Sequence, residues 1–275
     1  MELLIDGDVI VYRIGFATQK TVREAWSKDG VPDRWGGEPL ESFTNKADMD
    51  KWVKDNPTIE VELVSRLEAD PLAYALHSVK VYINGMIKKT KASKSRLFLT
   101  GKGNFRLTVD SEYKANRKGT AKPIHYQAIR DYMVKHLGAE MIEGMEADDA
   151  LALNQTSDTM IATIDKDLLM VAGEHYNFNT GEFKTITLEE GTHWFYMQML
   201  MGDKVDNIIG IKGIGKVKAA KILLESEDWD AAVESRYKDY FGDGWYQRMV
   251  QNTQLLWMLQ KDVKMPMDIR GDYEN

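Results

Sequence analysis

Short apolar runs that end at an acidic residue recur along this chain, with helical patterns between them. Residues 2–5 form one such run and end at Asp6, and residues 159–164 form another and end at Asp165. Between these two runs, apolar residues recur at helical spacing over residues 72–86. Strands that alternate with helices predict an α/β fold, with a mainly parallel central sheet flanked by helices.

Acidic residues gather where the predicted strands end and where a predicted helix begins. Ligands of open α/β sheets collect beyond the carboxyl ends of the strands. Two unit charges about 4 Å apart repel by about 4 kcal/mol at an effective dielectric near 20, so converging carboxylates need a counterion. Mg²⁺ or Mn²⁺ suits ligation by carboxylates alone. The candidate metal ligands are Asp6, Glu146, Asp148, Asp149, Asp165, Asp167, Asp203 and Asp206. For any single acid, the alternative of a helix cap or a surface charge stays open.

One segment of this acidic chain is strongly basic. The whole chain has 36 Lys and Arg against 43 Asp and Glu, a net charge of −7. Residues 85–122 hold 11 Lys and Arg against two acids, and Phe105, Tyr113 and Tyr126 lie within or just beyond this run. Aromatic rings between cations suit nucleic-acid bases and phosphates together. The segment therefore predicts contact with a polyanion, and a solvated Lys-rich loop is the alternative.

A glycine-rich segment at residues 202–220 predicts a second anion site. Glycines let backbone amides approach a phosphate closely, and a predicted helix begins directly after them. The residues expected to bind the phosphate backbone are Gly210, Lys212, Gly213, Gly215, Lys216 and Lys218. The residues expected to pack the two flanking helices together are Ile208, Ile211, Ile214, Val217 and Ala220. The first of these helices is expected to be capped by Thr192 and to run to about Met201. A plain glycine-rich turn between helices is the alternative.

Composition excludes several classes of protein. Cys is absent, which excludes disulfides, thiolate catalysis and zinc sites built on Cys. No apolar run approaches the ~20 residues that a membrane span needs. The first residues lack the basic and apolar stretches of a signal peptide. We therefore expect a cytoplasmic monomer with no membrane partner.

Several motifs, in this order, resemble the 5′-nuclease superfamily of flap endonucleases, 5′-nuclease domains of bacterial DNA polymerases and phage 5′–3′ exonucleases. They are residues 5–7, 104–106 with 113–117, 146–149, 164–168 and 202–220. The resemblance implies a PIN-like nuclease core at residues 1–200, with a basic arch at 85–122. Residues 19–62, which Pro32, Pro39 and Pro57 interrupt, are predicted from their own pattern to be a β-rich insertion that has no clear counterpart in the family. It also implies a helix–three-turn–helix module at residues 201–275, which grips duplex DNA, often around a monovalent cation such as K⁺. Phage exonucleases that stand alone look most similar.

Residues and resemblance together predict hydrolysis of DNA from 5′ ends, as a 5′–3′ exonuclease or 5′-flap endonuclease. Two Mg²⁺ or Mn²⁺ ions per site are expected. Asp6, Glu146, Asp148 and Asp149 are assigned to the first ion, and Asp165, Asp167, Asp203 and Asp206 to the second. Cations of the arch are expected to contact the scissile phosphate, and its tyrosine is expected to stack on a base near the 5′ end. The arch residues so assigned are Lys114, Arg117 and Arg106 at the phosphate, and Tyr113 and Lys118 for DNA binding.

The expected biological setting follows from the same resemblance. A phage-encoded enzyme of DNA replication, recombination or degradation would act on duplex with a 5′ end or 5′ flap, and also on RNA in RNA–DNA hybrids. One residue departs from the family pattern, because Thr100 stands where the family has a metal-binding Asp, and Asp8 is a candidate substitute. Two alternatives stay open: a non-catalytic, structure-specific DNA-binding protein with a degenerate metal site, and a PIN-type ribonuclease.

Overall fold

The computed structural model describes residues 1–28 and 38–267. Within these residues the chain forms two compact units, each built from segments that are separate in sequence. The large unit comprises Met1–Val9, Ile83–Ala121 and the described residues from Met133 onward. The small unit comprises the described residues of Ile10–Tyr82 together with Lys122–Tyr132. The boundary expected at residue 200 stays a prediction, and residues 29–37 and 268–275 of the expected domains lie outside the described residues.

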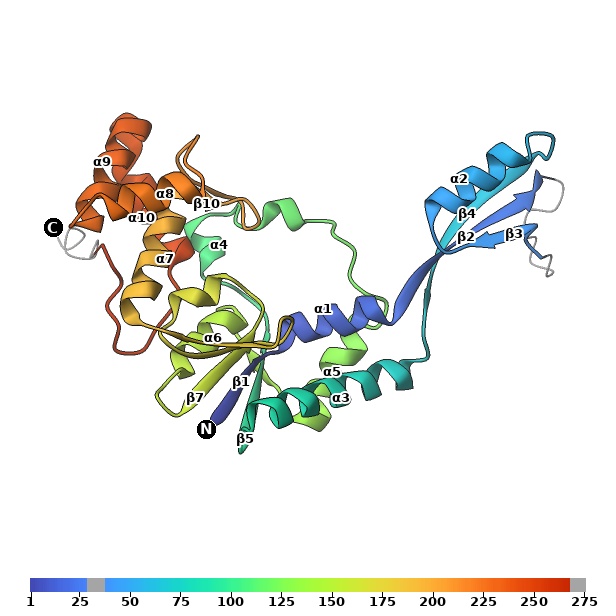
Figure 1. Ribbon diagram of the computed structural model, residues 1–275, viewed down its shortest axis with the longest axis horizontal. Coiled ribbons are helices and arrows are strands. Elements are labelled where there is room, and N and C mark those ends of the chain that lie inside the picture. Colours follow the sequence, from blue (N-terminus) through green and yellow to red (C-terminus); the bar gives the residue numbers. More distant parts are fainter. Residues whose placement is uncertain (29–37, 268–275) are drawn as a thin grey trace. The chain divides into compact units, whose positions relative to one another are not determined.

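A six-stranded sheet forms the centre of the large unit, with the strand order β6-β5-β1-β7-β8-β9. Figure 1 labels its neighbouring strands β5, β1 and β7. All neighbouring strands are parallel except β8 and β9, which are antiparallel. This confirms the predicted α/β class with a mainly parallel sheet. The strands are β1 (Glu2–Asp6), β5 (Lys94–Thr100), β6 (Glu140–Ile142), β7 (Thr159–Thr163), β8 (Gly173–Asn177) and β9 (Glu182–Ile186).

The inner strands form because their residues are apolar on both faces. Every residue of β7 is buried, and so are Leu3, Leu4 and Ile5 of β1. Such runs are typical of parallel strands with helices on both faces. The longer helices are α1 (Gly7–Ala17), α3 (Leu72–Thr90), α5 (Tyr126–Leu137), α6 (Ala147–Asn154), α7 (Leu188–Met201), α8 (Lys216–Leu224), α9 (Trp229–Phe241) and α10 (Trp245–Leu256). Shorter elements are α4 (Arg106–Val109), β10 (Gly202–Asp203), β11 (Ile208–Ile209) and the 3₁₀ turns η2 (Ala115–Arg117), η3 (Asp167–Met170) and η4 (Gly242–Gly244).

Helix α7 begins earlier than the sequence analysis expected. The Thr187 hydroxyl accepts a hydrogen bond from the Glu190 amide at 3.1 Å, and the Glu190 carboxylate accepts one from the Thr187 amide at 2.8 Å. This reciprocal capping box satisfies two amides that a helix start leaves without partners. The prediction of Thr192 as the cap was therefore wrong, because Thr192 lies inside the helix. The end of α7 at Met201 agrees with the prediction.

The small unit contains a three-stranded antiparallel sheet, with the strand order β3-β2-β4. A small apolar cluster joins the sheet to helix α2, with Ala25, Phe43 and Met49 buried and Trp52 and Val61 packed against them. Helix α2 is capped by the side chain of Asn45, which accepts a hydrogen bond from the Asp48 amide at 2.8 Å. These elements are β2 (Gln19–Ser27), β3 (Glu41–Phe43), α2 (Lys46–Asp55) and β4 (Val61–Ala69).

Within residues 1–28 and 38–267, no helix is both long and apolar enough to cross a membrane.

Candidate active site

The carboxyl ends of β1 and β7 bring Asp6 and Asp165 to one edge of the sheet. The Asp6 carboxylate accepts a hydrogen bond from the Val9 amide at 3.1 Å and one from the Thr163 hydroxyl at 2.8 Å. The same hydroxyl accepts a hydrogen bond from the Asp165 amide at 3.0 Å. Burial raises the pKa of the Asp6 carboxyl to about 7, and the charges of Asp8 and Asp165 add to this rise. The negative charges of Asp8 and Asp165 thus disfavour the ionised form of Asp6, which is the repulsion that the sequence analysis predicted.

The first turn of α6 adds further carboxylates to this edge. Burial, and then the negative charges of Asp6, Asp165 and Glu146, hold the pKa of Asp148 well above its ordinary value. Helix α6 packs against β1 and β5, which places its amino terminus beside the strand ends. A bound cation would relieve this repulsion between neighbouring carboxylates. Asp148 thus links the strand-end acids to those of the helix.

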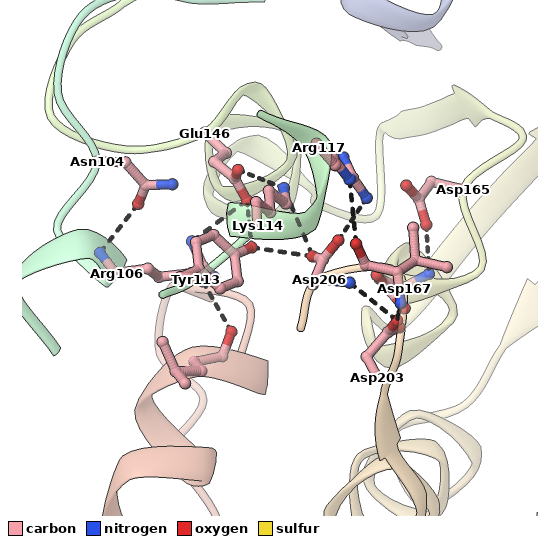
Figure 2. A network of polar contacts seen from close by, with 12 residues as sticks. Asn104, Arg106, Tyr113, Lys114, Arg117, Glu146, Asp165, Asp167, Asp203 and Asp206 are labelled. Atoms are coloured by element: carbon pink, nitrogen blue, oxygen red, sulfur yellow. Dashed lines mark hydrogen bonds and ion pairs between the residues drawn. The ribbon is translucent and has the colours of Figure 1, made fainter. Parts of the chain in front are cut away.

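Three donors from the basic segment contact Glu146 and Asp206, and two of the three contact both acids (Figure 2). The Tyr113 hydroxyl lies 3.0 Å from a carboxylate oxygen of each acid. The Lys114 ammonium forms an ion pair with Glu146 and lies 3.5 Å from Asp206. The Arg117 guanidinium forms a further ion pair with Asp206. Two predicted metal ligands are therefore neutralised by the cations that were predicted to contact phosphate.

The backbone fixes Lys114 in this position. Its φ of 56° is left-handed, and its amide donates a hydrogen bond to the Asp206 carbonyl at 2.9 Å. Burial alone would lower the pKa of Lys114, but the charges of Glu146 and Asp206 raise it above its ordinary value. The lysine is therefore fully protonated at neutral pH. Arg117 is half-exposed, so it keeps access to solvent.

A second ion-pair group contains Asp167 and Asp203. The Lys166 ammonium donates to Asp167 at 2.9 Å and to Asp203 at 2.5 Å. The buried Gln198 amide of α7 donates to the same oxygen of Asp167 at 2.6 Å. Burial and the charge of Asp165 raise the pKa of Asp167 to about 6, although Lys166 opposes the rise. The Asp203 carboxylate also accepts a hydrogen bond from the Val205 amide at 2.7 Å, and this bond fixes the turn after β10.

Arg106 and Asp149 form a buried pair next to Glu146, whose carboxylate lies 3.8 Å from the Arg106 guanidinium. Both side chains are fully buried, and two guanidinium nitrogens lie 2.5 and 2.9 Å from the two carboxylate oxygens. The guanidinium also donates to the carbonyls of Leu255 at 2.8 Å and Trp257 at 3.0 Å. In this structure neither side chain is exposed to a phosphate or an ion in solvent.

Tyr113 also differs from its expected setting. Its side chain is buried, with 4% of the residue exposed, so its ring offers no face to a base in solvent. Burial and the charges of Glu146 and Asp206 raise its pKa far above the ordinary value, so the hydroxyl stays protonated and can donate only one hydrogen bond. The ring is thus buried in the protein, and only its hydroxyl reaches the carboxylates.

Thr100 occupies a structural position at the end of β5. Its hydroxyl accepts a hydrogen bond from the Ala147 amide at 2.9 Å, at the first residue of α6. Its own amide donates to the Asp8 carboxylate at 2.9 Å. Asp8 therefore lies beside Thr100, as its suggested role as a substitute requires. That role stays a prediction.

The glycine-rich turn between β11 and α8 is open to solvent. Gly213 has a φ of +84°, which L side chains rarely adopt, and a Cβ on Gly210 would lie 2.1 Å from the Met201 carbonyl carbon. Gly210 is thus required by the close pairing of β10 with β11, whereas Gly213 is required by the turn. The exposed residues that could face a phosphate backbone are Lys118, Lys212, Gly213, Gly215, Lys216 and Lys218. Val217 is 85% exposed, so the expectation that it packs two helices together was wrong.

The predicted metal ligands form a row of neighbours rather than one closed cage. In residues 1–28 and 38–267, no three Asp, Glu or His side chains are arranged to hold a metal ion by themselves. Lys114, Arg117 and Lys166 occupy the space between several of the acids. The donor set still suits a hard divalent cation, because the buried acids repel one another and carry only oxygen ligands. The fit is strongest at Asp6 and Asp148, whose pKa values are raised first by burial and then by neighbouring carboxylates.

Three residues that hold the acids were not found from the sequence. The sequence pattern does not mark Thr163 or Gln198 as partners of the acids, because a single hydroxyl or amide side chain in a buried element has many possible partners. Lys166 could have been found, since it stands between two acids in the motif at residues 164–168. Each of the three donates to at least one predicted ligand.

Comparison with known proteins places these features in context. No family model matches the chain. It is 28% identical over 170 residues to the exodeoxyribonuclease of Enterobacteria phage T3, covering 56% of each protein. It is also 28% identical over 171 residues to the 5′-3′ exonuclease of Buchnera aphidicola subsp. Schizaphis graminum, covering 55% of this chain and 59% of that one. The chain thus spans little more than half the length of these relatives, and it spans 21% of the DNA polymerase I of Streptococcus pneumoniae.

Solved structures show the same fold. The bacteriophage T5 5′-exonuclease with bound zinc matches with a TM-score of 0.51 at 17% identity, over 93% of this chain and 86% of that one. A complex of the bacteriophage T5 flap endonuclease with DNA and metal ions matches with a TM-score of 0.50 at 16% identity, over 93% and 85%. The predicted PIN-like fold class is confirmed, and so is the resemblance to the 5′-nuclease superfamily.

Proposed function

We propose that this chain hydrolyses phosphodiester bonds of DNA from 5′ ends, as a 5′–3′ exonuclease or a 5′-flap endonuclease. The observation that carries the proposal is the row of carboxylates at the sheet edge beside Lys114 and Arg117. The names of the relatives from phage T3 and Buchnera support the same activity. The chain matches only 56% and 59% of the length of these relatives, so the argument for the activity depends on the site itself.

The row of acids would hold two divalent cations, and we propose Mg²⁺ or Mn²⁺. Such ions activate a water molecule and stabilise charge on the leaving oxygen. We assign Asp6, Glu146 and Asp148 to the first ion, and Asp165, Asp167, Asp203 and Asp206 to the second. Asp149 is left out, although the sequence suggested it, because its carboxylate is committed to the buried Arg106.

Lys114 and Arg117 would orient the scissile phosphate. Their charged groups lie against Glu146 and Asp206, so a phosphate bound near these acids falls within their reach. A cation aimed at a phosphate stabilises the charge that develops during hydrolysis. Tyr113 takes a positioning role in place of base stacking, because its hydroxyl lies 3.0 Å from a carboxylate oxygen of both acids. Arg106 takes a structural role, because it is fully buried.

The glycine-rich turn and α8 would hold the duplex. Amides at a helix amino terminus and nearby lysines bind phosphates without reading sequence. Replacing Lys212, Lys216 or Lys218 should weaken binding evenly across sequences and lower the salt slope by about one for each phosphate that is no longer neutralised. Weaker binding that is confined to some sequences would contradict this role.

We further propose that a monovalent cation such as K⁺ binds at the glycine-rich turn and that RNA–DNA hybrids are additional substrates. We also propose that the protein is a monomer, that it is cytoplasmic and that a phage encodes it.

The decisive test is Mg²⁺-dependent cleavage of 5′-labelled duplex and 5′-flap DNA. Asp148→Asn removes one charge at constant shape and should lower kcat by at least about 100-fold, as loss of one transition-state interaction does elsewhere. Asp158→Asn is the control, because Asp158 is exposed at the other end of β7. Full activity of Asp148→Asn would reject the assignment of the site.

The same assay separates the alternatives. A wild-type protein that binds flap DNA but cleaves nothing with Mg²⁺ or Mn²⁺ would be the non-catalytic DNA-binding protein, the alternative that Thr100 supports. Faster cleavage of single-stranded RNA than of any DNA substrate would indicate the PIN-type ribonuclease.

A further inference from the structure

We propose that Thr163 is a positioning residue whose hydroxyl sets the spacing of Asp6 and Asp165, and thereby the divalent-cation affinity of the site. This inference rests on the proposed function, because it assigns a role toward the ions that the acids would hold. The hydroxyl lies between the two acids, which belong to neighbouring strand ends. It is in contact with both of them but carries no charge itself.

The Thr163 hydroxyl forms one hydrogen bond in each direction. It donates to the Asp6 carboxylate at 2.8 Å. Its oxygen accepts the Asp165 amide at 3.0 Å, because an amide N–H can only donate. Thr163 is 7% exposed, so solvent hardly competes for either bond. One buried group therefore connects the side chain of Asp6 to the backbone of Asp165.

The sheet register makes this connection possible. Strands β1 and β7 are parallel, and Ile5 pairs with Ala162. The next residue of each strand is therefore Asp6 and Thr163, side by side at the carboxyl edge. Beyond them, the Asp165 carboxylate accepts the Asp167 amide at 2.9 Å. The chain of hydrogen bonds thus runs from Asp6 through Thr163 and Asp165 to Asp167, across both groups of proposed ligands.

This connection should lower the free energy that a cation must supply to bring the two acids together. Asp6 and Asp165 repel each other, so without Thr163 their side chains would turn apart when no cation is bound. A cation would then have to draw them together, and its affinity would fall. Groups that hold metal ligands from behind typically contribute about 10-fold to 100-fold in affinity. A valine has nearly the shape of threonine but lacks the hydroxyl, so Thr163→Val isolates this contribution.

The chain offers a matched control in the same strand. Thr159 begins β7 at the opposite edge, is 6% exposed, and donates its hydroxyl to the Gln155 side chain at 2.9 Å. Thr159→Val removes a buried hydroxyl of equal burial from the same strand, away from the acids. Thr163→Ser keeps the hydroxyl and serves as the conservative rescue. Thr163→Ala is the second variant, should valine prevent folding.

The experiment measures Mn²⁺ binding to the purified full chain by isothermal titration, with DNA affinity in EDTA as a metal-free readout. Thr163→Val should weaken Mn²⁺ binding by about 10-fold or more, with Thr163→Ser and Thr159→Val within about twofold of wild type. DNA affinity in EDTA should be equal in all four proteins. Folded Thr163→Val or Thr163→Ala with wild-type Mn²⁺ affinity overturns the inference, and so does an equally weakened Thr159→Val. If the wild-type chain binds Mn²⁺ but cleaves no nucleic acid, the proposed function fails while this inference stands.

Discussion

The buried pair of Arg106 and Asp149 gives the sharpest quantitative prediction. Replacing Arg106 with methionine keeps a long side chain but removes the charge and all its donors. It leaves the Asp149 carboxylate buried without its counterion, and it leaves the carbonyls of Leu255 and Trp257 without the guanidinium that now binds them. The structure therefore predicts a large loss of stability, although the residue lies in a segment that the sequence assigned to phosphate binding.

The magnitude follows from the groups that the guanidinium binds. Breaking a buried ion pair by removing one partner costs about 3–5 kcal/mol. Each carbonyl left without a donor adds a penalty of about 1–3 kcal/mol where water cannot reach it. These terms overlap, so we expect Arg106→Met to lower the free energy of unfolding by about 4–6 kcal/mol. The double variant Arg106→Met/Asp149→Leu should recover about 2 kcal/mol or more, because it buries no unpaired charge.

Urea unfolding, followed by circular dichroism and by tryptophan fluorescence, measures both quantities. Arg96→Met is the control in the same unit, because Arg96 forms a two-bond pair with Glu140 that is partly exposed. Its removal should cost no more than about 1 kcal/mol. The reasoning is refuted if Arg106→Met is destabilised no more than Arg96→Met. If Arg106→Met keeps wild-type stability yet no longer cleaves DNA, Arg106 contacts the phosphate as the sequence suggested.

Three further predictions concern charge, backbone and pH. Lys114→Met should lower kcat for DNA cleavage by about 100-fold with little change in KM, whereas the exposed Lys135→Met should not; equal rates would remove Lys114 from the phosphate. Gly213→Ala should cost about 1–2 kcal/mol in urea unfolding because its φ is +84°, whereas Gly215→Ala, at a φ of −108° and with open space around it, should be neutral; equal losses would contradict the turn geometry. Burial lowers the pKa of His175 below its ordinary 6.5, so its contribution to stability is complete above pH 6.5 and is lost as the pH falls through the folded-state value. Urea unfolding from about pH 7.5 to about pH 5.5 should therefore show a smaller loss for His175→Gln than for wild type, and parallel losses would exclude this role.

The sheet edge could be predicted because it depends on few details. A buried apolar run followed by an acid identifies the end of a parallel strand, and all such ends meet at one edge. Asp6 and Asp165 were therefore placed correctly without knowledge of any contact. The cap of α7 could have been predicted as well, since Thr187 and Glu190 have the spacing of a capping box, but Thr192 was chosen instead.

The partners of individual side chains could not be predicted. Arg106 and Tyr113 lie in one basic segment with Lys114, and nothing in their spacing shows which of them faces inward. Arg106 is buried because Asp149 and the carboxyl end of α10 reach it from distant parts of the sequence. Tyr113 is buried because Asp206 arrives from the turn after β10. Burial of this kind depends on tertiary contacts that a local pattern does not record.

The position of β1 in its sheet has a consequence for how the chain acquires its structure during synthesis. This strand is translated before the strands it pairs with, which are β5 on one side and β7, beginning only at Thr159, on the other. Non-local parallel pairing is intrinsically slow to form, because a long loop must close before any interaction rewards it. One edge of the apolar run Leu3, Leu4 and Ile5 therefore stays unpaired until the ribosome has passed β7, a period in which a chaperone or aggregation competes for it.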